Sequence, residues 1–530
     1  MLRPPYRLMF LILVCSGAMA LSGCAAGLAN RRSDSRPDRE LLDAAKRMEQ
    51  NSRTWNVTHR GIAGRPWLGV NAEIVFRLEQ LKALADQPDR FTPTAQETLD
   101  LMLAKGREDF VVGSAGLAQA PEMTRALAKQ GIAEQSRLAA LHSPEDRREW
   151  AQQLLDSAEL PDTNHGKTLR MLATLPAVPF VKLWIANHAK HEWRGANWRD
   201  FAAQRLYEPD TSGDQAILDH LAGATEEELL QLYAPLIVQE IPGESPPDRR
   251  DDSIGRVGLI PDRSGDPVAE VDESQPTVYG HLTHAYVGGR WLTQLNYSFW
   301  YHDHPELKAR DPEAGRAEGQ LVRITLDATH RPLVSEAVYA CGCYHRIYPL
   351  DDLEEAAKQA HGTPEQGDFV LARHIKGRID PAIPETGGRF SPAQPHPVVW
   401  VRSGFHLIAA VRFTESVPAA RETLAYDQLP SRDLELLPWG GETVSVFGKD
   451  GLVRGADRPE AALLFPSGMY HPGTPRIRGT HLIHFDQYRY TYPTLLEQML
   501  RIPDKGNLTY DLAAYRHHHS ADADRMRGEL

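Results

Sequence analysis

The stretch TVYGHLTHAYVGGRWLTQLNYSFWYHDH, from Thr277 to His304, decides the fold class of this sequence. Apolar and polar side chains alternate along both of its halves, with the period of two that is typical of a half-buried strand. Gly288 and Gly289 separate the halves, and a two-residue glycine loop favours an antiparallel hairpin. We therefore expect two long, paired strands here.

The same period continues through the C-terminal half of the chain. Further short strands are predicted at residues 320–327, 332–345, 397–413, 442–448 and 461–468. Two short helices are expected near residues 350–359 and 493–500. Strands that follow one another through tight turns form antiparallel sheets. Residues 254–500 are therefore expected to form a mostly antiparallel β domain, either a sandwich or a partial barrel.

The chain before this half shows a helical period instead. In residues 40–240 apolar side chains recur every three to four positions, as they do at Ile74, Leu78, Leu81 and Ala85. Ser143 and Thr225 each precede an acidic residue by three positions, which is the pattern of a capping box. Residues 241–253 contain three prolines and a run of charges, which indicate a linker. The predicted fold class is α+β, with an N-terminal all-helical region followed by the β domain.

The first residues have the layout of a secretory signal. Arg3 and Arg7 precede a short apolar run at residues 8–20, which is too short to span a bilayer. The run ends in Leu21-Ser22-Gly23-Cys24, which resembles the lipobox of bacterial lipoproteins. That resemblance implies that residues 1–23 are a signal peptide and that Cys24 becomes the lipidated first residue.

The lipoprotein resemblance also implies a location. Ala25 follows Cys24 where an aspartate would favour retention in the inner membrane, so we expect the outer membrane of a Gram-negative bacterium. Several acyl chains on one residue give a stable anchor. The small and polar residues 24–39 are expected to be a flexible tether, and residues 501–530 a polar C-terminal tail.

The charge of the chain bears on its partners. The sequence has 59 basic and 71 acidic residues, and removal of Arg3 and Arg7 with the signal leaves a net charge of −14. Such a body has no electrostatic footprint for nucleic acid. The expected partners are the membrane, through the anchor, and an envelope protein or a small-molecule ligand.

One face of the strand that ends at His304 is polar and carries a large indole. Its members are Gln294, Asn296, Ser298 and Trp300. Such a face fits an aromatic and polar ligand groove, or a sheet face that is simply solvated. Both interpretations remain open at this point.

Histidines of the β domain form a candidate metal site. His302 and His304 share a strand face, and His345, His484 and Asp486 are further candidate ligands for a divalent transition metal such as zinc. His281 and His284 are three positions apart, and such residues of a strand point to opposite faces. We therefore do not expect these two rings to bind one ion.

The stretch Ala340-Cys341-Gly342-Cys343 holds the two cysteines that lie outside the leader and its lipobox. The cysteines and His345 are expected to face one side of a strand. A disulfide that the kink at Gly342 allows, thiols without a function, and a metal site are the three alternatives.

Common catalytic signatures are missing from the sequence. It contains no GxSxG, HExxH or GxxxxGK[ST] motif. We therefore expect a lipid-anchored binding or scaffolding protein whose β domain holds the ligand. A metal-dependent envelope enzyme is the first alternative, and a thiol-redox protein that uses Cys341 and Cys343 is the second. The sequence leaves open whether the chain is an enzyme.

Overall fold

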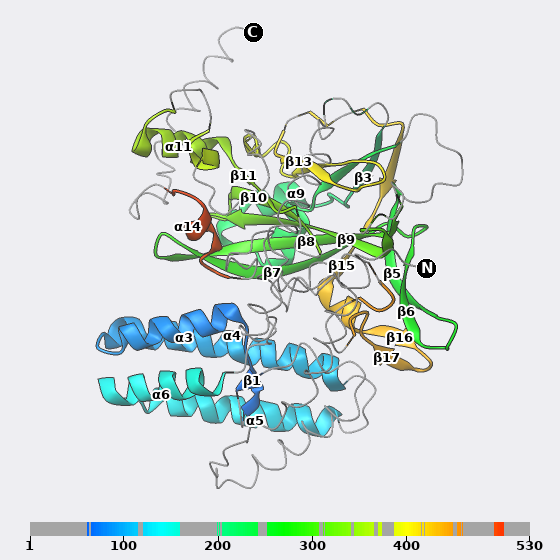
Figure 1. Ribbon diagram of the computed structural model, residues 1–530. Helices are drawn as coiled ribbons and strands as arrows, with labels where there is room; N and C mark the ends of the chain where they lie inside the picture. The colour runs from blue at the N-terminus through cyan, green and yellow to red at the C-terminus, as the bar shows by residue number, and fades with distance from the viewer. Residues whose placement is uncertain are drawn as a thin grey trace, which may run out of the picture.

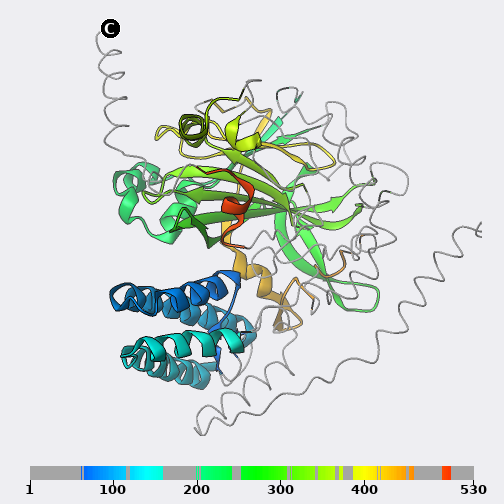
Figure 2. The same cartoon turned by 60° about the vertical axis from the view of Figure 1, so that its left-hand side comes forward.

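A computed structural model shows a layer of helices on one side and a larger β domain on the other (Figure 1). It describes most of residues 61–158, 201–241, 252–340, 344–373, 386–458 and 492–502. The predicted α+β class, with helices first and a β-rich region after them, is confirmed. The same two parts are visible after a 60° turn (Figure 2).

Within the residues that the structure describes, the helical layer has four helices and a small hairpin. Its elements are β1 (Gly61–Ile62), β2 (Arg65–Gly69), α3 (Ala72–Leu84), α4 (Pro88–Ser114), α5 (Ala120–Ala139) and α6 (Pro144–Ser157). The helices begin where the sequence supplies caps: Asn71 accepts from the Ile74 amide at 2.8 Å, and Ser143 with Asp146 forms the predicted capping box. Leu78 and Leu81 pack into the core of this layer.

The β domain contains an eight-stranded sheet. Six of its strands pair in the order β11-β10-β9-β8-β5-β6; of the other two, β7 pairs with β8 and β15 pairs with β7. Its strands are β5 (Ile254–Pro261), β6 (Pro267–Asp272), β7 (Thr277–Val287), β8 (Arg290–His304), β9 (Gly315–Leu326), β10 (Pro332–Tyr339), β11 (Arg346–Pro349) and β15 (Asp427–Pro430). The predicted hairpin is the β7–β8 pair, with Val287 opposite Arg290 across Gly288 and Gly289.

A second sheet of five strands packs against the first. It has the order β13-β12-β4-β3-β14, and its strands are β3 (Gln204–Glu208), β4 (Leu236–Glu240), β12 (Val398–Val401), β13 (Ile408–Arg412) and β14 (Glu422–Ala425). Leu295 and Tyr297 of the first sheet and Val399 and Val401 of the second share one buried core. The two sheets therefore bury their facing sides together, as in a sandwich.

Two strands of the second sheet lie inside the range that the sequence analysis assigned to helices. The predicted helix from Thr225 is shorter than expected: α10 (Glu226–Leu232) ends at Tyr233, and β4 follows. Pro235 explains the break, because proline disfavours helical geometry in the residue before it and lacks an amide hydrogen. β4 then pairs in parallel with β12, which is more than 150 residues away in the sequence.

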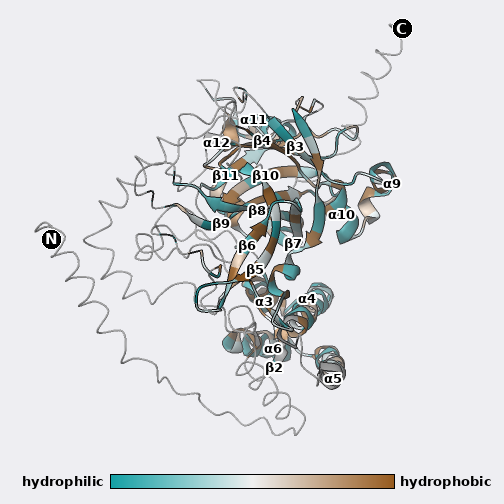
Figure 3. Ribbon diagram, turned by 90° about the vertical axis from the view of Figure 1, so that its right-hand side faces the viewer, coloured by the Kyte–Doolittle hydropathy of each residue, from teal (hydrophilic) through white to brown (hydrophobic). Residues whose placement is uncertain are grey.

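Short helices cover the remaining sides of the sheets. They are α9 (Asp214–Asp219), α11 (Asp351–His361), α12 (Val370–Arg373) and α14 (Leu495–Met499). Residues of α11, α12 and α14 share a core with Leu292, Leu321 and Val338 on the outer face of the large sheet. Figure 3 shows apolar segments on the strands inside the β domain and polar residues on α10. Within the described residues no helix combines the length and apolar character needed to cross a membrane.

Candidate functional site

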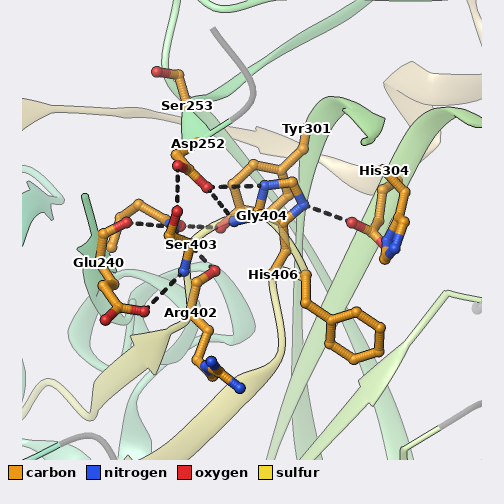
Figure 4. A network of polar contacts seen from close by, with 12 residues as sticks. Glu240, Asp252, Ser253, Tyr301, His304, Arg402, Ser403, Gly404 and His406 are labelled. Atoms are coloured by element: carbon orange, nitrogen blue, oxygen red, sulfur yellow. Dashed lines mark hydrogen bonds and ion pairs between the residues drawn. The ribbon is translucent and has the colours of Figure 1, made fainter. Parts of the chain in front are cut away.

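A buried cluster of charged side chains contains His304, His406 and Asp252, which Figure 4 labels, and is centred on Glu318 of β9. His304 Nδ1 donates to Glu318 Oε1 at 2.8 Å, and His406 Nδ1 donates to Glu318 Oε2 at 2.6 Å. The Arg458 guanidinium lies 3.6 Å from Glu318 Oε1. One carboxylate thus connects three cationic or protonatable side chains in the interior.

The cluster continues to Asp252, just before β5. Asp252 accepts hydrogen bonds from Ser403 Oγ at 2.7 Å and from the Gly404 amide at 2.6 Å, and His406 Nε2 lies 3.4 Å from its Oδ1. The ring of Tyr301 stacks on His406 with 3.8 Å between centroids and 2° between planes. The turn between β12 and β13 is therefore tied to β8, β9 and the start of β5.

The charges of the cluster stabilise one another. Burial disfavours the charged form of His406, but the hydrogen bonds and charges of Asp252 and Glu318 outweigh it and raise the pKa of His406 to about 9. Burial likewise opposes ionisation of Glu318, yet the two histidines hold the pKa of this carboxyl well below its usual range. At neutral pH His406 is therefore a cation between two carboxylates.

Strained backbone gathers around the same cluster. The φ angles of His406, Ala317 and Tyr344 are positive, at 48°, 52° and 54°, and residues other than glycine rarely adopt such angles. Ala317 precedes Glu318, and the Tyr344 ring packs on Phe405 with 5.3 Å between centroids. Strain of this kind costs about 1–3 kcal/mol per residue and often occurs at functional sites.

His304 has one ring nitrogen that the cluster does not use. Its Nε2 atom is buried and has no hydrogen-bond partner among the residues that the structure describes. This nitrogen has the chemistry of a proton acceptor or a metal ligand. However, the side chains of His304, Glu318 and His406 have at most 1% of their surface exposed, so the cluster is closed to solvent.

A cleft that opens to solvent lies between the helical layer and the β domain. It has a volume of about 930 Å³ and is lined by residues of α3, α4, α10, β7 and the segment around β15. This volume is in the range of small-molecule binding sites, which often occur between domains. The cleft is therefore a candidate binding site that a ligand can reach from solvent.

His281 and His284 of β7 both line this cleft. His281 Nδ1 lies 3.1 Å from Ser431 Oγ, and His284 Nδ1 lies 3.1 Å from Glu73 Oε1 of α3. The sequence analysis expected the two rings on opposite faces of a strand. β15 pairs with β7 only as far as Gly280, so the later residues of β7 lie at an edge that the cleft surrounds.

The lining of the cleft is acidic. It contains six carboxylates and two permanent cations; the carboxylates are Glu73, Glu108, Asp210, Glu226, Glu227 and Asp427. Of the cations, Lys105 is held by Asp109 at 2.9 Å and the other is Arg432. The cleft thus has a surplus of negative charge.

The predicted ligand groove on β8 is a buried polar layer. Gln294, Asn296, Ser298 and Trp300 are all buried, so they line no open groove in the described part of the structure. Gln294 Nε2 donates to Thr325 Oγ1 at 3.0 Å. The alternation could not show that this face is covered: Trp300 packs in a buried core with Leu434 and Phe447.

The structure separates the three described histidines of the predicted metal site. Each contacts a different carboxylate: His302 lies 3.2 Å from Glu270, His304 2.8 Å from Glu318, and His345 2.9 Å from Glu336, which also forms a bidentate pair with Arg323. Among the described residues no group of three or more His, Cys, Asp or Glu side chains is placed to hold a metal. His484 and Asp486 lie outside the described residues, so the zinc site stays a prediction.

The cysteine stretch lies between two strands. β10 ends at Tyr339 and β11 begins at Arg346, and the two are antiparallel, so His345 does not share one strand with Tyr339. Cys341 and Cys343 themselves lie outside the described residues, as does Cys24. Their expected chemistry stays a prediction.

Several residues of the two sites were missed by the sequence analysis. Glu318, Asp252 and His406 belong to no motif. The only signal of Glu318 and His406 is a charged or polar residue beside an apolar, strand-like segment, and Asp252 lies in the charge run of the predicted linker. Comparison with known proteins adds no assignment, because no family model, curated protein or solved structure matches the chain.

Proposed function

We propose that this chain is a lipid-anchored protein of the bacterial cell envelope that binds a small cationic ligand in the cleft between its helical layer and its β domain. The observation that carries the proposal is the cleft itself, which has a volume of about 930 Å³ and an acidic lining. A ligand with amine or guanidine groups gains charge interactions with this lining and donates hydrogen bonds to it.

The rim of the cleft offers carboxylates that are not already neutralised. Glu226 and Glu227 lie in the first turn of α10, and Asp427 begins β15, whose Gln428 donates to the Leu230 carbonyl of α10 at 3.0 Å. None of the three has an ion-pair partner among the described residues. A cation at the side of the cleft formed by α10 and β15 interacts with these carboxylates, and this defines where the ligand binds.

The binding proposal is tested by calorimetric titration of the purified chain with a series of organic cations, from a monoamine to a tetraamine. We expect affinity to rise with ligand charge and to fall as the salt concentration increases. The double variant Glu226→Gln/Glu227→Gln should bind roughly tenfold more weakly, which corresponds to about 1.4 kcal/mol.

The matched control removes the same charge elsewhere. Glu145 and Glu149 lie on the exposed surface of α6, away from the cleft, so Glu145→Gln/Glu149→Gln should bind like the wild type. Equal weakening in both double variants would show only a general charge effect. Absence of binding for every cation in the series would contradict the proposal.

The anchor is tested separately from the cleft. Cys24→Ser removes the thiol that the lipobox resemblance assigns to lipidation, and it should move the protein from the membrane fraction to the soluble fraction. Cys341→Ser provides a control that keeps the lipobox intact. A Cys24→Ser variant that stays membrane-bound would contradict lipid anchoring while leaving the cleft proposal unaffected.

A metal-dependent envelope enzyme is the second candidate, and one observation favours it. His304 has a buried Nε2 without a partner and a carboxylate, Glu318, behind its other nitrogen, which is the arrangement of many metal-ligating histidines. Elemental analysis of protein purified without chelators tests it. Less than about 0.1 metal ion per chain, with His304→Ala unchanged, would contradict this candidate.

A further inference from the structure

The helical layer contacts the β domain at the β7–β8 hairpin. Phe76 of α3 packs against Tyr286 and Trp291, with ring centroids 5.2 and 6.0 Å apart. The Arg77 guanidinium carbon lies 3.7 Å from the centre of the Trp291 ring. This contact between one helix and one hairpin places α3 directly beside the cleft.

One titratable ion pair crosses the same boundary. Glu73 Oε1 lies 3.1 Å from His284 Nδ1 of β7 and 2.9 Å from Arg77 Nε on its own helix. Arg77 is further held by Glu97 of α4 at 2.9 Å. Since Arg77 stays charged at all relevant pH values, His284 is the member of this set whose charge changes near neutral pH.

We propose that the Glu73–His284 pair is a pH-sensitive latch that holds the helical layer against the β domain at the wall of the cleft. Its release loosens α3 from β7 and widens the cleft, without unfolding either part. The contacts of α3 with the hairpin support the latch, and they do not depend on which ligand the cleft binds.

The charged neighbours of His284 come from several elements around the cleft. Glu73 and Arg77 face it from α3, and Glu226 acts on it from α10. Further charged groups line the same cleft, namely Lys105 and Glu108 of α4 and Asp427 and Arg432 near β15. The carboxylates prevail over the cations in this set, so protonated His284 is favoured.

The signs of the pKa shifts define the pH window of the latch. Burial lowers the pKa of His284, but the hydrogen bond and charge of Glu73 outweigh it and raise the pKa above the ordinary value of 6.5. Burial opposes ionisation of Glu73, but His284 and Arg77 lower its pKa below 4.5. The latch is thus complete between about pH 4.5 and 6.5, and it weakens as the pH rises through the raised pKa of His284.

Hydrogen exchange of the full chain at pH 5.5, 7.0 and 8.5, corrected for intrinsic exchange rates, tests the latch. We expect the opening constant of amides in α3 and in residues 284–291 to rise at least threefold from pH 5.5 to 8.5. Amides of α6 lie in the helical layer, which contains neither the latch histidine nor the His406 cluster, and should change less than twofold. Equal changes in both regions would overturn the proposal, because they would indicate a general loss of stability.

Substitutions identify the group that titrates. His284→Gln should give, at pH 5.5, the opening constant that the wild type has at pH 8.5, and it should remove the pH response. His281→Gln, on the same strand and in the same cleft, should keep the response. Glu73→Gln provides a second test, because it removes the partner charge and leaves the histidine. A wild-type pH response in both His284→Gln and Glu73→Gln would overturn the proposal.

Discussion

Two histidines that are two residues apart on β8 have very different surroundings. His302 lies at the rim, with 33% of its side chain exposed, and contacts Glu270 of β6 at 3.2 Å. His304 is completely buried and contacts Glu318 of β9 at 2.8 Å. Their shared strand face predicted one pair of metal ligands, yet the two rings contact carboxylates on different strands.

The difference shows that burial decides how much a histidine–carboxylate pair contributes to the stability of the protein. The His302–Glu270 pair is screened by water, and exposed pairs contribute about 0–1 kcal/mol. The side chains of the Glu318 cluster are buried, so water does not screen their charges. Removal of one partner therefore leaves a buried charge without its counter-charge. The Glu73–His284 pair, with 22% of the histidine side chain exposed, lies between these two cases.

The largest expected effect comes from removing the charge at the centre of the buried cluster. Glu318→Gln keeps the shape of the side chain but leaves His406 and Arg458 without their shared carboxylate. We expect the free energy of unfolding to fall by about 3–5 kcal/mol, as it does when a buried ion pair loses one partner. Urea denaturation followed by far-ultraviolet circular dichroism measures this loss. A loss below about 1 kcal/mol would show that the cluster does not support the fold.

A dependence on pH is the next largest effect. The pKa of His406 is raised to about 9 from an ordinary value of 6.5. Its contribution to the free energy of unfolding is therefore complete below pH 6.5 and disappears as the pH rises through about 9. A shift of this size corresponds to about 3 kcal/mol. The difference in unfolding free energy between wild type and His406→Gln should therefore shrink from pH 6 to pH 9.5.

A control for this pH profile comes from His302, at the rim of β8. The hydrogen bond with Asp303 and the charge of Glu270 raise the pKa of His302 to about 9, although partial burial opposes this. Water screens this pair, so His302→Gln should follow the wild-type profile closely. If the pH profile of His406→Gln also matched that of the wild type, this would contradict the assignment of the pH dependence to the Glu318 cluster.

Local sequence patterns predicted much of the fold. The alternation in residues 277–304 predicted β7 and β8, and the capping patterns at Ser143 and Thr225 predicted the starts of α6 and α10. What local patterns could not supply was pairing over long distances. Leu236 of β4 lies opposite Val398 of β12, and nothing near either residue identifies the other.

The candidate sites were less predictable for the same reason. Glu318 became the centre of a cluster because residues 304, 406 and 458 meet there, although they are far apart in the sequence. The cleft depends on the position of α3 relative to β7, and the sequence does not encode that position in any motif. Period-two reasoning could not show that His281 and His284 line one cleft, where they contact different partners, Ser431 and Glu73.

A smaller effect is expected from a neutral member of the cluster. Ser403→Ala removes the hydroxyl that donates to Asp252 Oδ2 at 2.7 Å, while the Gly404 amide still donates to the other oxygen. We expect a loss of about 1 kcal/mol, the usual contribution of one hydrogen bond, in the same urea titration. Ser264→Ala, in the exposed turn between β5 and β6, should change stability by less than about 0.5 kcal/mol. Equal losses in the two variants would mean that Asp252 does not need the hydroxyl.

The smallest effect is expected at the rim, where Glu270→Gln is the counterpart of Glu318→Gln. Glu270 contacts His302 at 3.2 Å and Arg316 at 3.4 Å, and both partners are partly exposed. Water replaces the lost carboxylate, so the free energy of unfolding should fall by about 0.5 kcal/mol or less. Denaturation in 0.05 M and 0.5 M sodium chloride checks the cause, because salt screens an exposed pair and should reduce even this difference. A loss above about 1.5 kcal/mol that persists in high salt would mean that the rim pair behaves like the buried one, and that burial does not separate the two histidines of β8.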